Sequence, residues 1–123
     1  MDHSEGFLKI AEEAKSRVRE ITVEQAASRV AAKKDLHFID VREDNEWAAG
    51  HAVGAEHSSR GVIERDIEKK VPDKETELIL YCGGGYRSAL ATDSLQKMGY
   101  KNVYSVAGGW AAWTEAGLPT STD

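Results

Sequence analysis

The fold of this chain is decided by the stretch Leu78-Ile79-Leu80-Tyr81-Cys82-Gly83-Gly84-Gly85-Tyr86-Arg87-Ser88. Its four apolar residues indicate a buried strand, and the residues from Ser88 onward have the pattern of a helix, which Ser88 is suited to cap. Three glycines in a row remove the Cβ atoms that would keep backbone N–H groups from turning inward, so the loop can form an anion-binding nest. Cys82, the only cysteine of the chain, stands at this strand-to-helix turn. Because a thiol at a helix N-terminus ionises more readily than a free thiol, Cys82 is predicted to be a nucleophile.

Strands and helices alternate on both sides of this stretch. We expect strands over 36–41, 55–57, 78–81 and 102–106, and helices over 23–34, 43–49, 61–70, 88–98 and 109–116. Thr22 and Gln25 have the spacing of a capping box. The alternation predicts a single α/β domain with a mostly parallel central sheet of about five strands and helices on both faces, because parallel crossovers are helical and right-handed. In such a sheet the site lies beyond the carboxyl ends of the strands, where Asp40, Arg42 and Cys82 are expected.

The first twenty residues carry a pattern of their own. Apolar residues recur there at spacings of three and four, at Phe7, Leu8, Ala11, Ala14 and Val18. This spacing predicts an amphipathic helix that packs on the main body. It is interpreted either as a plain extension with a solvated face or as a helix for dimerisation or partner binding. We therefore divide the chain into an N-terminal helical extension (1–20), a main domain (21–119) and a tail (120–123).

Composition narrows the class of function. The chain has 16 basic and 21 acidic residues and a net charge of −5, and its basic residues do not cluster with aromatic ones, so we expect no nucleic-acid partner and no anionic membrane surface. The sequence has no apolar run of the roughly 18 residues that span a bilayer and no secretory pattern at its start, so a cytoplasmic location is expected. A single cysteine cannot form an internal disulfide, which fits a reducing compartment. Any sulfur intermediate on it must be resolved by an external acceptor.

The histidines do not suggest a metal centre. His3, His37, His51 and His57 lack the spacing of a metal site, and there is no second cysteine to help them. We expect neither a metal nor another cofactor. His51 is interpreted as a structural hydrogen-bonding residue.

Three segments, in order, resemble the signatures of one known family, the single-domain rhodaneses. The first is Phe38-Ile39-Asp40-Val41-Arg42 with Glu46-Trp47, Gly50-His51 and Gly54-Ala55; the second is Tyr81 to Ser88; the third is Val106-Ala107-Gly108-Gly109-Trp110 with Trp113, Gly117, Leu118 and Pro119. The resemblance extends over residues 21–119 and implies a rhodanese-like domain with sulfurtransferase activity.

The resemblance also implies a role for each residue of the expected site. Cys82 would take a sulfane sulfur from a donor such as thiosulfate or a polysulfide, hold it as a persulfide, and pass it to cyanide or a thiol. Donor binding is expected from the loop and from a residue beside its mouth: Gly83, Gly84, Gly85, Tyr86, Arg87, Ser88 and Arg60. A persulfide ends in an anionic sulfur, which inward N–H groups and a helix dipole stabilise, so the residues support this chemistry independently. Family loops that use thiosulfate carry basic residues where this chain has glycines, so polysulfides, persulfides and mercaptopyruvate remain open as donors.

Two other functions are considered. One is a persulfide relay or partner-binding module whose acceptor is another protein. The other is a cysteine phosphatase or arsenate reductase. Four residues separate Cys82 from Arg87, whereas cysteine phosphatases use five, and the shorter loop favours a terminal sulfur over a phosphate.

Each arginine near the site has two interpretations. Arg87 either binds the donor anion or pairs with Asp40 inside the fold, and we favour the pair. Arg42 is expected in the same supporting network, with Glu46 as a partner. Arg60 either attracts a dianionic donor over a Debye length of about 8 Å or is an ordinary surface residue.

Overall fold

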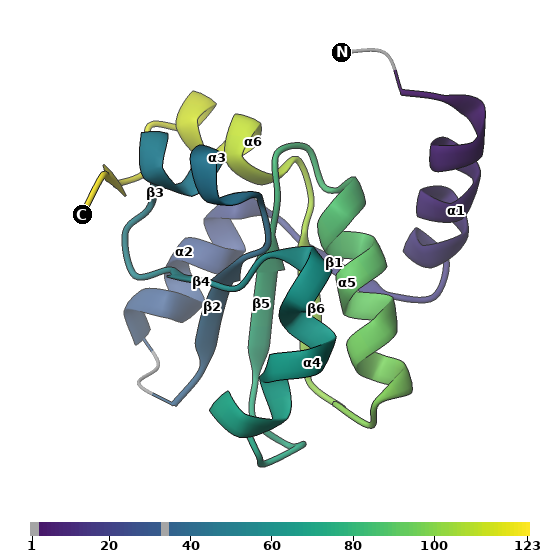
Figure 1. Ribbon diagram of the computed structural model, residues 1–123. Coiled ribbons are helices and arrows are strands. Elements are labelled where there is room, and N and C mark those ends of the chain that lie inside the picture. The colour runs from purple at the N-terminus through teal and green to yellow at the C-terminus, as the bar shows by residue number, and fades with distance from the viewer. Residues whose placement is uncertain (1–2, 33–34) are drawn as a thin grey trace.

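A computed structural model describes residues 3–32 and 35–123, and Figure 1 shows a central sheet with helices on both faces. Within these residues the sheet has five parallel strands in the order β1-β6-β5-β2-β4: β1 (Arg19–Ile21), β2 (His37–Asp40), β4 (Glu56–His57), β5 (Leu78–Tyr81) and β6 (Val103–Val106). A separate antiparallel pair is formed by β3 (His51–Ala52) and β7 (Thr120–Ser121). The helices are α1 (Glu5–Lys15), α2 (Val23–Ala32), α3 (Asp44–Ala49), α4 (Arg60–Lys70), α5 (Tyr86–Lys97) and α6 (Gly109–Glu115). The predicted α/β fold with a five-stranded parallel sheet is confirmed.

The central strand β5 explains the uninterrupted apolar run. Successive side chains of a strand point to opposite faces of the sheet. Leu78 and Leu80 pack with α4 and α5 on one face, whereas Ile79 and Tyr81 pack with α2 and α6 on the other. All four residues are buried. A strand covered on both faces requires apolar residues at every position, which is the pattern of this segment.

Most elements lie where the sequence predicts them, with ends displaced by a few residues. The capping box of α2 is confirmed, because Gln25 N donates to Thr22 Oγ1 at 3.1 Å and Thr22 N donates to Gln25 Oε1 at 2.8 Å. The helix was expected to continue to residue 34, but 33–34 lie outside the described residues.

Three short strands were not predicted. β1 pairs in parallel with β6, and two of its three residues are exposed. β3 and β7 have two residues each and pair with one another although they are far apart in the sequence, since His51 is opposite Ser121. None of the three carries the apolar run that indicates a strand, so their positions depend on tertiary pairing.

Helix α1 packs against α5, which confirms the prediction that it lies on the main body (Figure 1). Ala11 and Ala14 are fully buried and belong to the same apolar cluster as Ala89 and Leu90 of α5. Small side chains at this contact let the two helices approach closely. Whether α1 also meets a partner stays a prediction.

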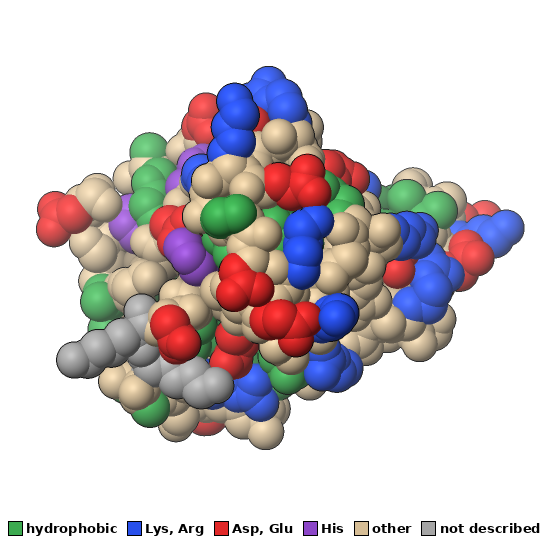
Figure 2. All heavy atoms as spheres, turned by 90° about the horizontal axis from the view of Figure 1, so that it is seen from below, with side chains coloured by type: hydrophobic (Ala, Val, Ile, Leu, Met, Phe, Trp, Pro, Cys, Tyr) green, Lys and Arg blue, Asp and Glu red, His purple; other side chains and the backbone are tan. Residues whose placement is uncertain are grey.

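The outer surface mixes charges of both signs. Seen from below, acidic and basic side chains are interspersed and apolar ones are scattered between them (Figure 2). Among the described helices, none combines the length and the apolar character needed to cross a bilayer.

Candidate active site

Cys82 begins the loop that joins the central strand β5 to α5, and only 1% of the residue is exposed. Its sulfur accepts the backbone N–H of Gly85 at 3.1 Å and that of Ser88 at 3.3 Å. The loop therefore turns amides inward as predicted, and their dipoles favour a negative charge on the sulfur. Cys82 also lies in an apolar cluster of the sheet, so aliphatic packing and amide contacts occur at the same side chain.

Ser88 does not cap α5, contrary to the prediction. The helix begins two residues earlier, at Tyr86, with Gly85 as its N-cap at φ +103°, a left-handed conformation that glycine adopts without strain. Ser88 therefore lies in the first turn and is fully buried. Its hydroxyl oxygen accepts the thiol of Cys82 at 3.5 Å and lies 2.8 Å from the hydroxyl of Ser105 on β6. Ser105 was missed, although a serine inside the apolar strand Val103–Val106 is a signal that could have indicated it.

Replacing Ser88 with alanine is expected to slow alkylation of Cys82 by iodoacetamide about tenfold at neutral pH. Once the thiol has lost its proton, the Ser88 hydroxyl at the same place can donate to the thiolate instead of accepting from it. A hydrogen bond to a charged group contributes roughly 1.5–3 kcal/mol, and this variant removes the hydroxyl while keeping the amide. Ser105→Ala is the matched control, because it removes the hydroxyl partner of Ser88 and leaves the sulfur contacts in place. An unchanged rate in a folded Ser88→Ala protein would contradict the assigned contact.

The loop is held from its other side by the start of α6. Trp110 N donates to Cys82 O at 2.7 Å, and Ala111 N donates to Gly83 O at 3.1 Å. Gly109, at φ +51°, makes this approach possible, because a Cβ there would collide with the carbonyl group of Cys82. The third sequence signature thus supports the loop through backbone contacts.

Asp40 and Arg42 form a buried ion pair at the carboxyl end of β2. Asp40 accepts Arg42 Nε at 3.1 Å and Nη2 at 2.8 Å, and it also accepts the backbone N–H of Arg42 at 2.9 Å. The guanidinium donates to Gly50 O at 2.6 Å and lies over the ring of Trp110 at 4.7 Å. Burial opposes the charge on Arg42, yet the hydrogen bonds and charge of Asp40 leave its pKa raised above the ordinary value.

Arg42 belongs to the buried network around Asp40, as predicted, but the predicted carboxylate partners of both arginines are wrong. Arg87 contacts Glu46 of α3 instead of Asp40, at 2.7 Å and 3.1 Å, and Arg42 pairs with Asp40 instead of Glu46. The reason is local: Arg42 lies two residues from Asp40 and occupies both of its carboxylate oxygens. The hydrogen bond of Arg87 lowers the pKa of Glu46, and Glu46 in turn raises the pKa of Arg87.

Arg87 nevertheless lies beside the loop. A Cβ placed on Gly83 would be 3.0 Å from Arg87 Nη2, so the guanidinium covers the start of the loop. About 30% of the Arg87 side chain is exposed. Arg60 is exposed at the first residue of α4, where its backbone N–H donates to Val41 O at 3.0 Å. This position agrees with the surface interpretation, and attraction of a donor by Arg60 stays a prediction.

Two residues of the first signature, Trp47 and His51, form a ring stack with His57. Trp47 lies parallel to His51, with ring centroids 3.4 Å apart, and is stacked with His57 at 5.1 Å. His51 Nδ1 lies 2.9 Å from Trp47 O, and His57 Nε2 lies 2.7 Å from Arg42 O. Both histidines therefore have structural contacts. Among the residues that the structure describes, no three His, Cys, Asp or Glu side chains gather as metal ligands would.

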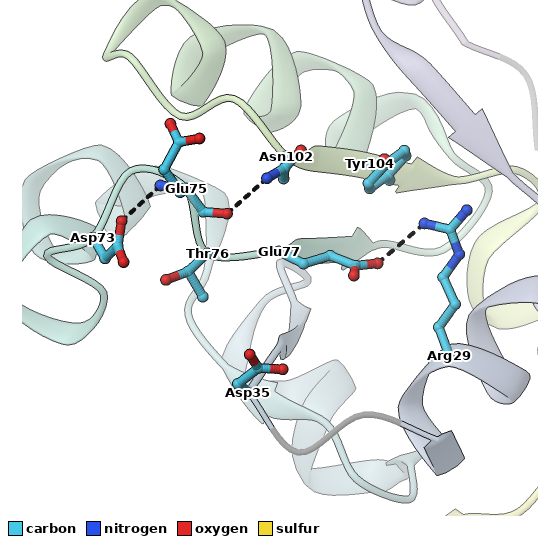
Figure 3. Close-up of a pocket in the computed structure, with 8 residues that line it drawn as sticks. All are labelled: Arg29, Asp35, Asp73, Glu75, Thr76, Glu77, Asn102 and Tyr104. Carbon is cyan, nitrogen blue, oxygen red and sulfur yellow. Dashed lines mark hydrogen bonds and ion pairs between the residues drawn. The ribbon is translucent and has the colours of Figure 1, made fainter.

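A polar hollow of about 680 Å³ lies at the opposite edge of the sheet, where strands begin rather than end (Figure 3). It is lined by Arg29, Asp35, Asp73, Glu75, Thr76, Glu77, Asn102 and Tyr104. Several of its groups bond to each other, as Arg29 does with Glu77 at 3.0 Å and Asn102 with Glu75 O at 2.7 Å. Because Cys82 follows the carboxyl end of β5, this hollow is separate from the candidate active site.

The structure thus defines an α/β protein in which a buried cysteine, whose sulfur accepts two backbone amides, lies at the carboxyl edge of a five-stranded parallel sheet. Residues 22–116 match the family model described as the rhodanese-like domain. The chain belongs to this family.

Curated relatives agree with this assignment. YtwF of Bacillus subtilis is 35% identical over 96 residues, which are 78% of this chain and 90% of that protein. The thiosulfate sulfurtransferase GlpE of Coxiella burnetii is 35% identical over 72% of this chain and 80% of its own length. YrkF of Bacillus subtilis is 30% identical over 80% of this chain, which spans only 52% of that longer protein.

Solved structures share the fold along nearly the whole chain. A protein of unknown function from Rhodopseudomonas palustris, described as a possible tyrosine phosphatase, has a TM-score of 0.84 at 29% identity and covers 98% of both chains. The polysulfide-sulfur transferase homodimer of Wolinella succinogenes has a TM-score of 0.82 at 29% identity, over 94% of this chain and 87% of its own.

Proposed function

We propose that this protein is a sulfurtransferase that moves a sulfane sulfur from a donor to a thiophilic acceptor through a persulfide on Cys82. One observation carries the proposal: the sulfur of Cys82 accepts the amides of Gly85 and Ser88 in a loop whose dipoles favour an anionic sulfur. The activities in the names of GlpE and of the Wolinella protein are consistent with it.

In the first step the Cys82 thiolate attacks the outer sulfur of the donor. A new S–S bond forms, and the bond between that sulfur and the rest of the donor breaks. The leaving group departs with the bonding electron pair, as sulfite when the donor is thiosulfate. The charge on the enzyme moves from Cys82 Sγ to the terminal sulfur, and no proton is transferred. The chain therefore needs no general base for this step.

In the second step a nucleophilic acceptor attacks the terminal sulfur of the persulfide. The S–S bond to Cys82 breaks and its electrons return to Sγ, so cyanide leaves as thiocyanate and a thiolate leaves as a persulfide. The thiolate that is regenerated has the same amide contacts as at the start. Because the inward amides stabilise sulfur anions in both states, the loop serves both half-reactions.

The charge around the loop bears on the donor. Gly83, Gly84 and Gly85 offer no cationic side chain, and the charge of Arg87 is partly offset by Glu46 at 2.7 Å. A dianion such as thiosulfate gains from nearby cations, whereas a polysulfide or persulfide chain depends less on them. We therefore expect polysulfides to load Cys82 faster than thiosulfate does.

The rival chemistry is phosphate-ester hydrolysis, which the description of the Rhodopseudomonas structure raises. A phosphatase loop must surround three phosphate oxygens and uses its arginine to bind two of them. Here only four residues separate Cys82 from Arg87, and Glu46 holds the Arg87 guanidinium at two points. Both features favour a terminal sulfur as the bound anion.

The experiment is intact-protein mass spectrometry of the full chain after incubation with polysulfide, thiosulfate or mercaptopyruvate. We expect a gain of one sulfur atom that is lost on adding cyanide or a dithiol. An adduct that small acceptors remove only slowly would indicate a relay to a protein acceptor. No adduct with any of the three donors, or hydrolysis of an aryl phosphate instead, would overturn the proposal.

A further inference from the structure

Helix α1 lies outside the residues that match the family, yet it packs against α5, whose first turn carries the sulfur ligands (Figure 1). Both helices begin at the end of the molecule where β5 leads into the active-site loop. Just after the end of α1, Arg17 donates from Nε and Nη2 to the carboxylate of Asp93 in α5, at 3.1 Å and 2.8 Å. Gln96 Nε2 of α5 donates to Arg17 O at 3.0 Å. α1 is therefore fixed against α5 from its first turn to its last.

The contact at the active-site end is centred on Tyr86. Lys15 Nζ lies 4.4 Å from the centroid of the Tyr86 ring, a cation–π distance. The ring of His3 meets it edge-on at 5.0 Å, and the ring of Phe7 does so at 6.1 Å. Phe7, Ala11 and Lys15 follow one another at intervals of four residues, so they lie on one face of α1. Among the described residues, the rings and the cation that contact Tyr86 all come from the N-terminal segment 3–15.

Tyr86 is also the first residue after the three glycines whose side chain can fix the position of the loop. From Gly83 to Gly85 the loop has no side chains, and glycine loses more conformational freedom on ordering than any other residue. The start of the loop is held by α6, through Trp110 N and its 2.7 Å bond to Cys82 O. The end of the loop is Gly85 at φ +103°, one of the two amides on the sulfur, and the first side chain after it is that of Tyr86.

We propose that α1 is part of the active site, with His3, Phe7 and Lys15 as positioning residues that hold Tyr86 and so keep the amides of Gly85 and Ser88 directed at the sulfur. The inference deepens the proposed function and rests on it only for the identity of the reaction. The Rhodopseudomonas structure is matched over 98% of this chain, so an equivalent of α1 is present in another member of the fold.

The test measures how well the amides of Gly85 and Ser88 stabilise the Cys82 thiolate, and it needs no sulfur donor. The rate of alkylation of Cys82 by iodoacetamide is followed against pH in the full chain. A change in the accessibility of Cys82 multiplies the alkylation rate by the same factor at every pH. The pH at which the rate is half-maximal depends instead on how well the thiolate is stabilised. Arg87 and Glu46 also face the loop, and they are retained in every variant.

For Tyr86→Ala we expect the half-maximal pH to rise by about one unit, because the loss of one well-directed amide corresponds to roughly a tenfold change. Tyr86→Phe keeps the ring and is expected to restore the wild-type profile. Lys15→Ala is expected to shift the profile in the same direction by a smaller amount, and Lys15→Arg to restore it. Lys15 also lies 4.0 Å from Glu20, so Glu20→Gln is the control that removes this ion pair and leaves the ring contact.

The same variants are assayed for sulfur transfer, with kcat and KM separated. If Tyr86 positions the loop, kcat/KM falls in Tyr86→Ala and returns to the wild-type value in Tyr86→Phe. Thermal unfolding identifies any variant that does not fold, and the change Lys15→Ala at a half-buried position then replaces Tyr86→Ala as the decisive case. A folded Tyr86→Ala or Lys15→Ala protein with an unshifted alkylation profile would overturn the inference. A shifted profile in a protein that never forms a persulfide would retain the inference and reject the proposed function.

Discussion

The Cys82→Ser variant is expected to form no sulfur adduct and to transfer sulfur no faster than a protein-free blank. A serine hydroxyl is not ionised at neutral pH without an adjacent base, and it cannot form the S–S bond on which the proposed cycle depends. The fold should survive, because oxygen can accept the amides of Gly85 and Ser88 that the sulfur accepts now. Mass spectrometry with polysulfide and a thiocyanate assay measure the two half-reactions.

A second variant separates the need for a thiol from the need for the loop. In the Cys82→Ser background, Thr122→Cys places one thiol in the exposed C-terminal tail, so the number of cysteines is unchanged. We expect this protein to remain at the blank rate, since its thiol lacks the amides of the loop. Turnover by either variant near the wild-type rate would show that Cys82 is not the sulfur carrier.

The features that could be predicted from sequence are those that local pattern determines. The strand Leu78–Tyr81 is found at its predicted bounds because a strand buried on both faces is apolar at every position. Cys82 lies in its predicted loop because three glycines between a strand and a helix leave few other conformations for the turn. The short strands β1, β3 and β7 could not be predicted, since pairing with distant segments forms them.

Side-chain partners were the weaker part of the prediction. Spacing placed Asp40, Arg42 and Arg87 at one edge of the sheet, but it does not tell which carboxylate each arginine reaches. Likewise, Ser88 satisfies the preference for a polar N-cap, yet Gly85 reaches the left-handed conformation that starts the helix earlier and frees Ser88 for the sulfur. Tyr86 shows the same limit, because nothing near it in sequence indicates that residues 3–15 would contact it.

Replacing Asp40 with alanine is expected to cost about 3–5 kcal/mol of unfolding free energy, because it leaves the Arg42 charge buried without its partner. Asp40 is fully buried and 96% of the Arg42 side chain is covered, so water cannot replace the lost carboxylate. Small domains have roughly 5–15 kcal/mol of stability in total, which makes this a large fraction. Urea unfolding followed by circular dichroism, with linear extrapolation, measures the difference.

Two further variants test whether the unpaired charge of Arg42 causes the loss of unfolding free energy. Asp66→Ala removes an aspartate whose partner, Arg65, is largely exposed, and we expect no measurable change because solvent screens that pair. The double variant Asp40→Ala with Arg42→Met removes both buried charges and is expected to recover part of the loss, since no ion is then left without a partner. Two results would contradict this account: a cost of less than about 1 kcal/mol for Asp40→Ala, or a double variant that is less stable than the single one. Either would show that Arg42 stabilises this edge of the sheet by packing between the rings of Tyr81 and Trp110 and not by its charge.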